Sequence, residues 1–346
     1  MNLKKFDSRH RKNLSSRAKR VKDIVDDARK RAVAIAYSAG YEGEGDFFFD
    51  DYPAAKAQME SLLQETAYLL KSNIINGNAD GWGLSSSKVA VIVAYVKKHA
   101  DLPQSKVEKW TDTLDDKLDE FNSRKVATVR LSDQRTVNMD LSSRVWNLSG
   151  QFKQEMELAV EAAMKKGMSA DDLSREVRKY LNQPDKLFRR VRDKSGALRL
   201  SKAAQAYHPG VGVYRSSYMN AKRMTVTEIN AAYRTADYLR WKSMPFIKGI
   251  EIDITSSRHV PDICDDLKGR YPKDFKFTGW HPFCKCHATP ILPEPDEFAG
   301  WDGQGDMGGI EDVPENYRAW LSSNRERIKK AKHMPSFLKD NKKYSS

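Results

Sequence analysis

The spacing of apolar residues predicts that most of this chain is helical. Residues 14–39, 54–73 and 104–122 each place apolar side chains at close to helical spacing. Residues 86–99 do the same with several β-branched side chains, and their length favours a helix over a strand. The N-terminal part of the chain is therefore expected to form a series of amphipathic helices.

Two breaks are predicted within this series. Residues 40–53 combine glycine, acidic residues and a proline, which indicates a loop. Residues 76–83 (NGNADGWG) indicate a turn, because glycine and asparagine adopt turn conformations at little steric cost.

A helical hairpin is predicted between residues 145 and 182. Its first helix carries an apolar stripe and ends at Gly167, a residue type that is common just after helix C-termini. Ser169 and Asp172 then have the spacing of a capping box, which marks the start of the second helix. That helix is expected to stop before Pro184.

The rest of the chain mixes long helices with short extended segments. Residues 125–141 are rich in valine and threonine and predict a hairpin or an extended connector. Residues 216–244 predict a long helix ended by a proline, residues 249–255 alternate as a strand does, and residues 316–332 predict a last amphipathic helix. The predicted fold class is α+β, predominantly α-helical, with a small β-rich C-terminal lobe.

Charge is distributed unevenly along the 346 residues. The net charge is +13, and residues 1–31 hold twelve Lys or Arg against four Asp. Such a basic arm is either a solvated helix face or a surface for nucleic acid or an acidic partner. The candidate contact residues are Arg9, Arg11, Lys12, Arg17, Lys19 and Arg20. Residues 294–315 contain no Lys or Arg and are expected to be an acidic, glycine-rich linker.

No membrane association is predicted. No apolar run approaches the roughly 20 residues that span a bilayer. The basic N-terminus has no apolar segment behind it and therefore does not match a secretory signal. Three cysteines, an odd number, indicate reduced thiols rather than a disulfide framework.

All three cysteines fall in one short segment together with three histidines. Cys264, His281, Cys284 and Cys286 could supply the four ligands of a structural zinc site. Alternative ligands in the same segment are His259, His287, Asp262 and Asp265. Two other interpretations stay open: small buried thiols that act as apolar core residues, and a catalytic metal or thiol centre.

The same segment carries a family resemblance. Residues 225–235 (TVTEINAAYRT), the turn HVPDICDDLKG and the motif GWHPFCKC together resemble the Mu F-like minor head proteins of tailed phages. The resemblance covers roughly residues 145–292. Lys285 replaces the arginine usual in the family's His-Pro-x-Cys-Arg-Cys signature, and the arginine often found before Thr-Glu is absent. The matching helix residues are Thr227, Glu228, Asn230 and Arg234.

The resemblance implies a minor structural protein of the phage head, without enzymatic activity. It implies action in procapsid assembly at the portal, with portal and capsid or scaffolding proteins as partners and packaged DNA as a further candidate. The expected location is the virion, and the bacterial host cytoplasm during assembly. The alternatives are a metal-dependent nuclease and a zinc-containing nucleic-acid-binding protein.

The expected organisation has four parts. Residues 1–143 form an N-terminal helical region with the basic arm, and residues 144–293 form the Mu F-like domain. Residues 294–315 form the linker, and residues 316–346 form a C-terminal helix and tail.

Overall fold

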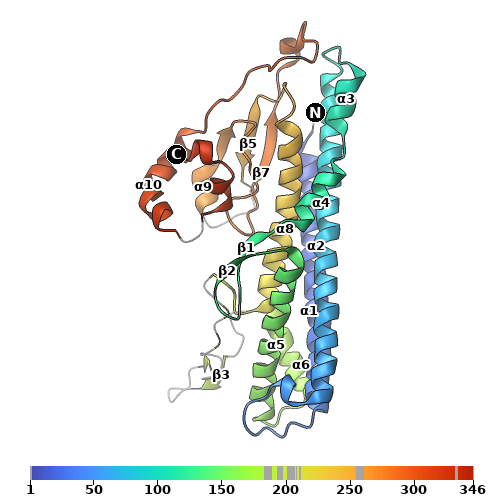
Figure 1. Ribbon diagram of the computed structural model, residues 1–346, viewed down its shortest axis with the longest axis vertical. Coiled ribbons are helices and arrows are strands. Elements are labelled where there is room, and N and C mark those ends of the chain that lie inside the picture. Colours follow the sequence, from blue (N-terminus) through green and yellow to red (C-terminus); the bar gives the residue numbers. More distant parts are fainter. Residues whose placement is uncertain are drawn as a thin grey trace. The chain divides into compact units, whose positions relative to one another are not determined.

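The computed structural model of the chain contains long helices and small antiparallel sheets, of which three lie within the described residues (Figure 1). The structure describes residues 2–182, 189–192, 198–200, 207, 209, 212–254, 261–331 and 334–345. The helices are α1 (Lys4–Ser38), α2 (Pro53–Val96), α3 (Gln104–Thr111), α4 (Asp115–Ser123), α5 (Leu141–Met164), α6 (Ala170–Asn182), α8 (Ser217–Trp241), α9 (Ile263–Leu267), α10 (Glu315–Lys330) and α11 (Ser336–Lys339). Short 3-10 helices are η1 (Phe49–Asp51), η3 (Pro295–Phe298) and η4 (Lys342–Tyr344). The strands are β1 (Val126–Val129), β2 (Thr136–Met139), β3 (Arg189–Arg192), β4 (Leu198–Leu200), β5 (Gly249–Asp253), β6 (Gly269–Tyr271) and β7 (His287–Ile291). The predicted class, α+β and mostly helical, is confirmed.

The chain divides into two compact units. The first unit contains residues 1–15, 76–121 and 226–346, and the second contains residues 16–75 and 122–225. Helices α1, α2 and α8 each contribute residues to both units. The boundaries of these two units therefore differ from the domain boundaries expected from the sequence at residues 143 and 293. The expected domain boundaries stay predictions.

The predicted turn at residues 76–83 is wrong, because α2 runs through it without a break. Trp82 is buried against Phe121, and its indole N–H donates to the Thr113 carbonyl oxygen at 2.9 Å. An added Cβ at Gly81 would lie 3.3 Å from the Tyr233 Cβ, so this glycine allows α2 and α8 to approach closely. Packing thus overrides the local preference of glycine and asparagine for turns.

The single helix expected over residues 104–122 is also wrong, because α3 and α4 are separate. The Asp112 side chain accepts a hydrogen bond from the Leu114 N–H at 2.9 Å, and Leu114 has a positive φ of 55°. An aspartate side chain that accepts a hydrogen bond from the backbone N–H two residues later replaces the backbone hydrogen bond of a helix. This replacement explains the break between α3 and α4.

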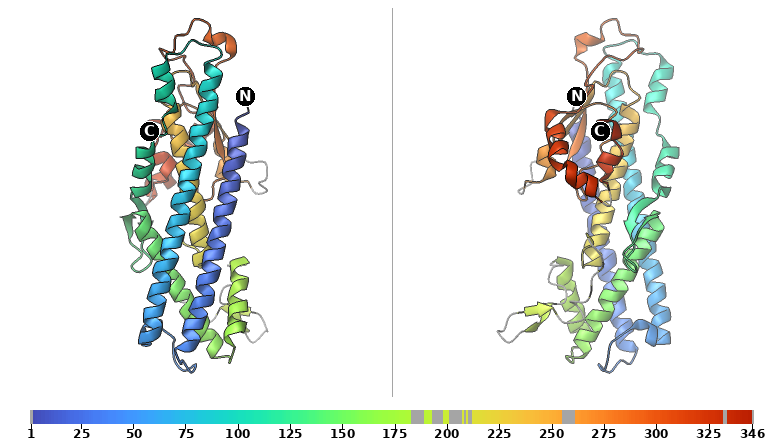
Figure 2. Two further views of the ribbon diagram at one scale, coloured as in Figure 1. Left: turned by 90° about the vertical axis from the view of Figure 1, so that its right-hand side faces the viewer. Right: turned by 60° about the vertical axis from the view of Figure 1, so that its left-hand side comes forward.

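The helical hairpin of the second unit is confirmed and lies where α5 and α6 run antiparallel (Figure 2). Gly167 has φ +65°, and the next N–H, of Met168, donates to the Ala163 carbonyl at 3.1 Å, as in a Schellman motif. The Asp172 N–H donates to the Ser169 hydroxyl at 3.1 Å, which is the capping bond that the sequence indicates. The β1–β2 hairpin precedes α5, as one of the two sequence-based alternatives requires.

The first unit contains the three-stranded sheet, in the order β6-β5-β7 with both pairs antiparallel. Ile250 and Ile252 of β5 are buried with Tyr271 of β6 and the aromatic residues that follow it. The sheet thereby carries α9 and the Cys/His segment on its connecting loops.

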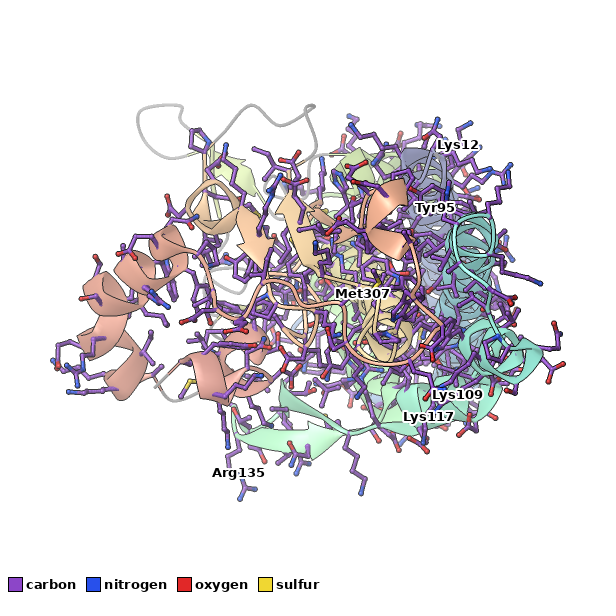
Figure 3. The ribbon with its side chains drawn as sticks, turned by 90° about the horizontal axis from the view of Figure 1, so that it is seen from above. Lys12, Tyr95, Lys109, Lys117, Arg135 and Met307 are labelled. Atoms are coloured by element: carbon purple, nitrogen blue, oxygen red, sulfur yellow. The ribbon has the colours of Figure 1, made fainter. Side chains whose placement is uncertain are left out.

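Residues 294–315, which were expected to be a linker, pack against the segment before β5. The N–H of Met307, labelled in Figure 3, donates to the Pro245 carbonyl at 3.0 Å, and the N–H of Ile310 donates to the Lys248 carbonyl at 2.7 Å. At Gly309 an added Cβ would lie 2.1 Å from the Lys248 oxygen. Gly309 thus permits a close approach to the backbone of Lys248.

Within the described ranges, no helix combines the length and the apolar character that crossing a membrane requires.

Candidate metal centre

Cys264 is positioned by the short helix α9, whose start is capped by two aspartates. The Asp262 side chain accepts from the Cys264 N–H at 2.7 Å, and the Asp265 side chain accepts from the Asp262 N–H at 2.8 Å. This is a complete capping box. Both carboxylates, which the sequence offers as alternative ligands, are therefore engaged in fixing the helix that presents Cys264.

The loop of residues 281–286 supplies the other ligand atoms. Phe283 has φ +63°, and the Cys284 N–H donates to the His281 carbonyl at 3.1 Å, which closes a tight turn. Gly279 lies just before it, where an added Cβ would come within 2.7 Å of the Arg234 Nη1. The loop therefore needs glycine there in order to lie close to α8.

Three potential ligand atoms converge at this point. The Cys264 Sγ lies 3.1 Å from the His281 Nε2 and 4.0 Å from the Cys284 Sγ, and all three atoms lie within 4.8 Å of one another. A tetrahedral ion with zinc–sulfur bonds of about 2.3 Å holds its ligand atoms roughly 3.5–4 Å apart. The Cys264, His281 and Cys284 group could thus bind a metal ion.

Cys286 lies next to this group. Its thiol interacts by hydrogen bonding with the thiols of both Cys264 and Cys284, and all three side chains are buried. The structure thus brings together the four residues that the sequence singles out, with Cys286 adjacent to the three that converge most closely.

His281 is oriented as a metal-binding imidazole would be. Its Nδ1 lies 2.6 Å from the Pro282 carbonyl oxygen, which can only accept, so Nδ1 carries the proton. The lone pair on Nε2 then faces the Cys264 thiol, with the Asp262 carboxylate 3.3 Å away. A backbone carbonyl that fixes the tautomer in this way is a common companion of ligating histidines.

The surroundings favour a thiolate at Cys284. Hydrogen bonds from the Cys264 thiol and then from the Cys286 thiol hold the pKa of Cys284 well below that of a free thiol, although burial opposes this. The positive charge of Arg234 lowers the pKa of Cys284 further. The pKa of Cys264 is raised by its hydrogen bonds to the other two thiols. Because thiolate is the form that binds metals, a Cys284 thiolate could serve as a ligand of an ion at this cluster.

Helix α8 binds the backbone of the loop of residues 281–286 through three of the residues that carry the family resemblance. The buried Arg234 guanidinium donates to the carbonyl oxygens of Cys284 (2.9 Å) and Cys286, and also to that of Thr278 (2.9 Å). The Asn230 amide donates to the Cys284 carbonyl at 3.2 Å, and the Thr227 hydroxyl accepts from the Phe283 N–H at 3.3 Å. Thr227, Asn230 and Arg234 share one helical face, which we call the α8 cradle.

The α8 cradle is itself supported by α1. His10 is buried, stacks on the Tyr233 ring at 4.1 Å, and its Nε2 lies 2.9 Å from the Asn230 Oδ1. Burial lowers the pKa of His10 to about 3, so this imidazole is neutral at physiological pH. Its Nε2 donates to the amide oxygen, which leaves the Asn230 amide N–H free to donate to the loop.

A buried charged group lies beside His10. The Lys88 ammonium contacts the Asp237 carboxylate at 2.6 Å and the Asp7 carboxylate at 3.6 Å, and the Tyr233 hydroxyl donates to Asp7 at 2.8 Å. Sequence reasoning missed Asp7 and His10. The available signal was their helical spacing from Leu3, which lies just before α1, and Phe6, since a solvated arm would not place apolar residues at that spacing.

The remaining predicted site residues lie apart from this convergence or outside the described residues. His287 begins β7 and is half-buried, and burial lowers its pKa. Glu228 is buried on α8. His259 lies outside the described residues.

Most of the basic arm is exposed on α1. Lys12 projects outward in Figure 3. Arg17 is half-buried, whereas the others are exposed: Arg9, Arg11, Lys12, Lys19 and Arg20. The arm therefore keeps both of its sequence-based interpretations, a solvated face and a contact surface.

Models of protein families, curated proteins and solved structures were all compared with the chain, and none of them matches it.

Proposed function

We propose that this chain is a minor head protein of a tailed phage or prophage that acts in head morphogenesis. The observation that carries the proposal is the contact between the two halves of the motif. The α8 cradle binds the backbone of the HPFCKC loop, although Asn230 and Cys284 lie 54 residues apart in the sequence. Both the α8 segment and the HPFCKC loop resemble the same family. Because they also contact each other, together they support the resemblance more strongly than either segment alone.

We propose further that the Cys/His cluster is a structural zinc centre with Cys264, His281, Cys284 and Cys286 as ligands. The separations of 3.1 Å and 4.0 Å, the orientation of His281 and the buried thiols all suit a tetrahedral ion. Four protein ligands leave no coordination position for a substrate, which is typical of structural rather than catalytic zinc. The ion would tie α9 to the loop that precedes β7 and contribute to folding.

The role that follows is structural, in procapsid assembly, with the virion as the final location. Portal and capsid or scaffolding proteins are the proposed partners, and the exposed cations of α1 suit contact with packaged DNA. A nuclease that uses Asp262 and Asp265 is less well supported, since both carboxylates cap α9.

Metal analysis tests the zinc centre. Protein purified from zinc-supplemented medium is expected to hold about one zinc ion per chain, and Cys264→Ser and Cys284→Ser are expected to lose it. Lys285→Ala is the matched control, because this exposed residue lies between two ligands but offers no ligand atom. A wild-type protein without zinc, whose melting temperature is also unchanged by added zinc, would contradict the zinc centre.

Co-sedimentation tests the assembly role. The chain is expected to pellet with assembled portal rings of the same phage, and to do so equally with Lys285→Ala. Failure to associate with portal, capsid or scaffolding protein would contradict the assembly role whatever the metal content. Cleavage of DNA that is lost in Asp265→Ala and His281→Ala would favour the nuclease instead.

A further inference from the structure

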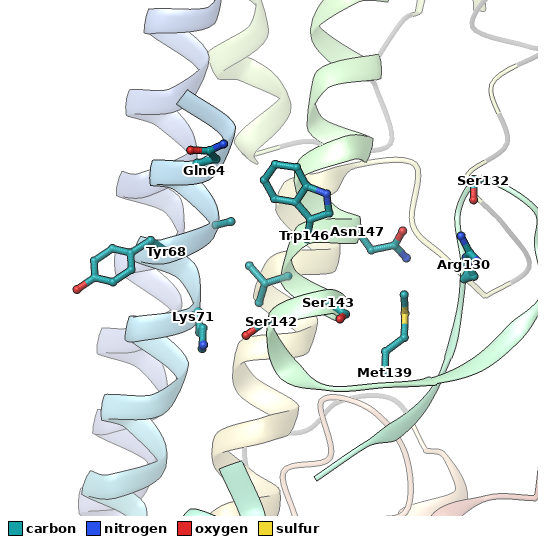
Figure 4. A pocket seen from close by; sticks show the side chains of 12 residues that line it. Gln64, Tyr68, Lys71, Arg130, Ser132, Met139, Ser142, Ser143, Trp146 and Asn147 are labelled. Atoms are coloured by element: carbon teal, nitrogen blue, oxygen red, sulfur yellow. The ribbon is translucent and has the colours of Figure 1, made fainter. Parts of the chain in front are cut away.

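An open cavity of about 600 Å³ lies in the second unit, between α2, the β1–β2 hairpin and the start of α5 (Figure 4). Two of its lining side chains are unusually exposed aromatics: Trp146 is 50% exposed and Tyr68 is 69% exposed. Met139 and Val145 add further apolar surface. Large apolar side chains exposed together around a cavity are typical of a binding surface.

The charged side chains that line this cavity are both basic. Lys71 comes from α2 and Arg130 from the end of the β1–β2 hairpin. Arg130 lies 3.6 Å from Asp133, but Asp133 makes closer contacts of 2.9 Å and 3.1 Å with Arg135. The cavity therefore combines an apolar surface with positive charge, and it would accept an apolar group flanked by carboxylates.

The same unit carries a loop with that chemistry. Phe48 is 48% exposed, and its neighbours Phe47 and Phe49 are buried. Exposed carboxylates surround it in sequence, and residues 32–55 contain no Lys or Arg. These exposed acidic residues are Glu42, Glu44, Asp46, Asp50 and Asp51. We call residues 42–51 the acidic loop.

The acidic loop cannot enter the cavity of its own chain. Asp50 is held by Lys153 at 2.6 Å, and the Phe49 N–H donates to Glu157 at 3.1 Å. Lys153 and Glu157 follow Trp146 on α5 by two to three turns, or about 10–16 Å at 1.5 Å per residue. Phe48 is accordingly not among the residues that line the cavity. Only another molecule could bring such a loop to it.

We propose that two copies of this chain join head to tail through these surfaces. Phe48 of one copy occupies the cavity of the next and packs on its Trp146, while the flanking carboxylates face Lys71 and Arg130. Such a contact uses different surfaces on the two copies, so the pair keeps one free cavity, on the first copy, and one free acidic loop, on the second. Repetition therefore gives a ring if the rotation closes and a filament if it does not.

Sedimentation velocity over a range of protein concentrations tests this. The wild type is expected to associate, and Phe48→Ser and Trp146→Ala are each expected to raise the dissociation constant more than about tenfold, as loss of a central aromatic contact does. Met334→Ala is the matched control, because Met334 is a comparably exposed apolar residue of the first unit. Lys71→Glu, which removes no apolar contact, is expected to weaken association as well. Circular dichroism should show that all four variants are folded.

A mixing experiment tests the head-to-tail geometry. Phe48→Ser keeps an intact cavity and Trp146→Ala keeps an intact acidic loop, so an equimolar mixture is expected to form dimers and nothing larger. A mixture that stays monomeric would overturn the geometry.

Two further outcomes would overturn the proposal itself. One is a wild type that remains monomeric up to about 100 μM, where even a weak contact would be populated. The other is unchanged self-association in Trp146→Ala and Lys71→Glu together with weaker binding of a fluorescent single-stranded oligonucleotide, which would make the cavity a nucleic-acid site. Neither outcome depends on zinc content or on portal binding.

Discussion

At the scale of single residues, Arg234 orders the backbone around the candidate centre. One buried guanidinium donates to three carbonyl oxygens of the Cys/His segment and lies 4.9 Å from the centre of the Phe277 ring. Its planar fork of donors suits several carbonyls at once, which an ammonium group does not. The same charge favours the Cys284 thiolate, so one side chain serves both the shape and the chemistry of the loop.

Replacing Arg234 should therefore destabilise the first unit strongly. Arg234→Met leaves the Thr278 and Cys286 carbonyls without this donor, whereas the Cys284 carbonyl keeps the Asn230 amide, and each buried unpaired group costs roughly 1–3 kcal/mol. We expect a loss of at least about 2 kcal/mol in urea denaturation, with a smaller loss for Arg234→Lys. Arg9→Met, at an exposed site on α1, is the control. A loss for Arg234→Met within the range of that control would refute the α8 cradle as the loop's support.

Glu155 gives the second unit a pH-dependent stability. Its buried carboxyl group accepts from the Ser217 hydroxyl at 2.6 Å and lies 3.4 Å from the Tyr207 hydroxyl. Burial raises the pKa of Glu155 to about 8, above its ordinary value of 4.5. A raised folded-state pKa means that the contribution of this group to stability is complete below pH 4.5 and is lost as the pH rises to about 8.

Denaturation at several pH values checks this sign. The free energy of unfolding should fall between pH 5 and pH 8 by up to about 1.4 kcal/mol per pH unit, and Glu155→Gln should flatten that slope. Burial also raises the pKa of Glu157, but this residue is present in both the wild type and Glu155→Gln. The difference between their two slopes therefore reports on Glu155 alone. Equal slopes in the two proteins would show that Glu155 is already ionised in the folded state.

At the scale of elements, α2 shows how packing overrides local sequence. Gly81 and Gly83 lie in its C-terminal half and differ in their surroundings. Gly81 lies against Tyr233 of α8, whereas Gly83 is exposed with open space where a Cβ would project. The helix tolerates both, but only one of them is needed for helix packing.

These two glycines form a matched pair for mutation. Gly83→Ala should stabilise the protein by about 0.5–1 kcal/mol, because alanine has the higher helix propensity. Gly81→Ala gains the same propensity but places a methyl group 3.3 Å from the Tyr233 Cβ, so we expect net destabilisation. Thermal unfolding of both variants decides the matter. If both raised the melting temperature equally, α2 and α8 would not be in close contact at Gly81.

How much the sequence predicts depends on whether the cause is local. The α5–α6 hairpin is predicted correctly because Gly167, Ser169 and Asp172 act on neighbouring backbone. The continuity of α2 is missed because the burial of Trp82 depends on residues far along the chain.

The same distinction holds at the candidate centre. The ligand types and their spacing can be read from the sequence, but the bond from His10 to Asn230 spans 220 residues and leaves no local pattern. Asp262 and Asp265 are a second example. The sequence offers both as alternative ligands, and the structure shows that both carboxylates cap α9.

At the scale of the whole molecule, the net charge of +13 predicts salt-dependent binding to DNA. If the basic arm makes this contact, replacing Arg9, Arg11 and Lys12 by Gln should lower the slope of log K against log salt concentration by about 2–3. Replacement of the exposed Lys97 and Lys98 by Gln is the control and should leave the slope nearly unchanged. Equal effects of the two sets in a filter-binding assay would assign the affinity to overall charge rather than to the arm.

The bond between His10 and Asn230 also has a consequence for biosynthesis. The N-terminal turns of α1 are translated more than 200 residues before Asn230, Tyr233 and the Cys/His segment. At about 5–20 residues per second, Leu3, Phe6 and His10 wait roughly 10–45 seconds for their partners. During that interval the nascent chain exposes an apolar helical face. We therefore expect the first unit to complete its folding only after the Cys/His segment has left the ribosome, and a holding chaperone to bind the emerging α1 until then.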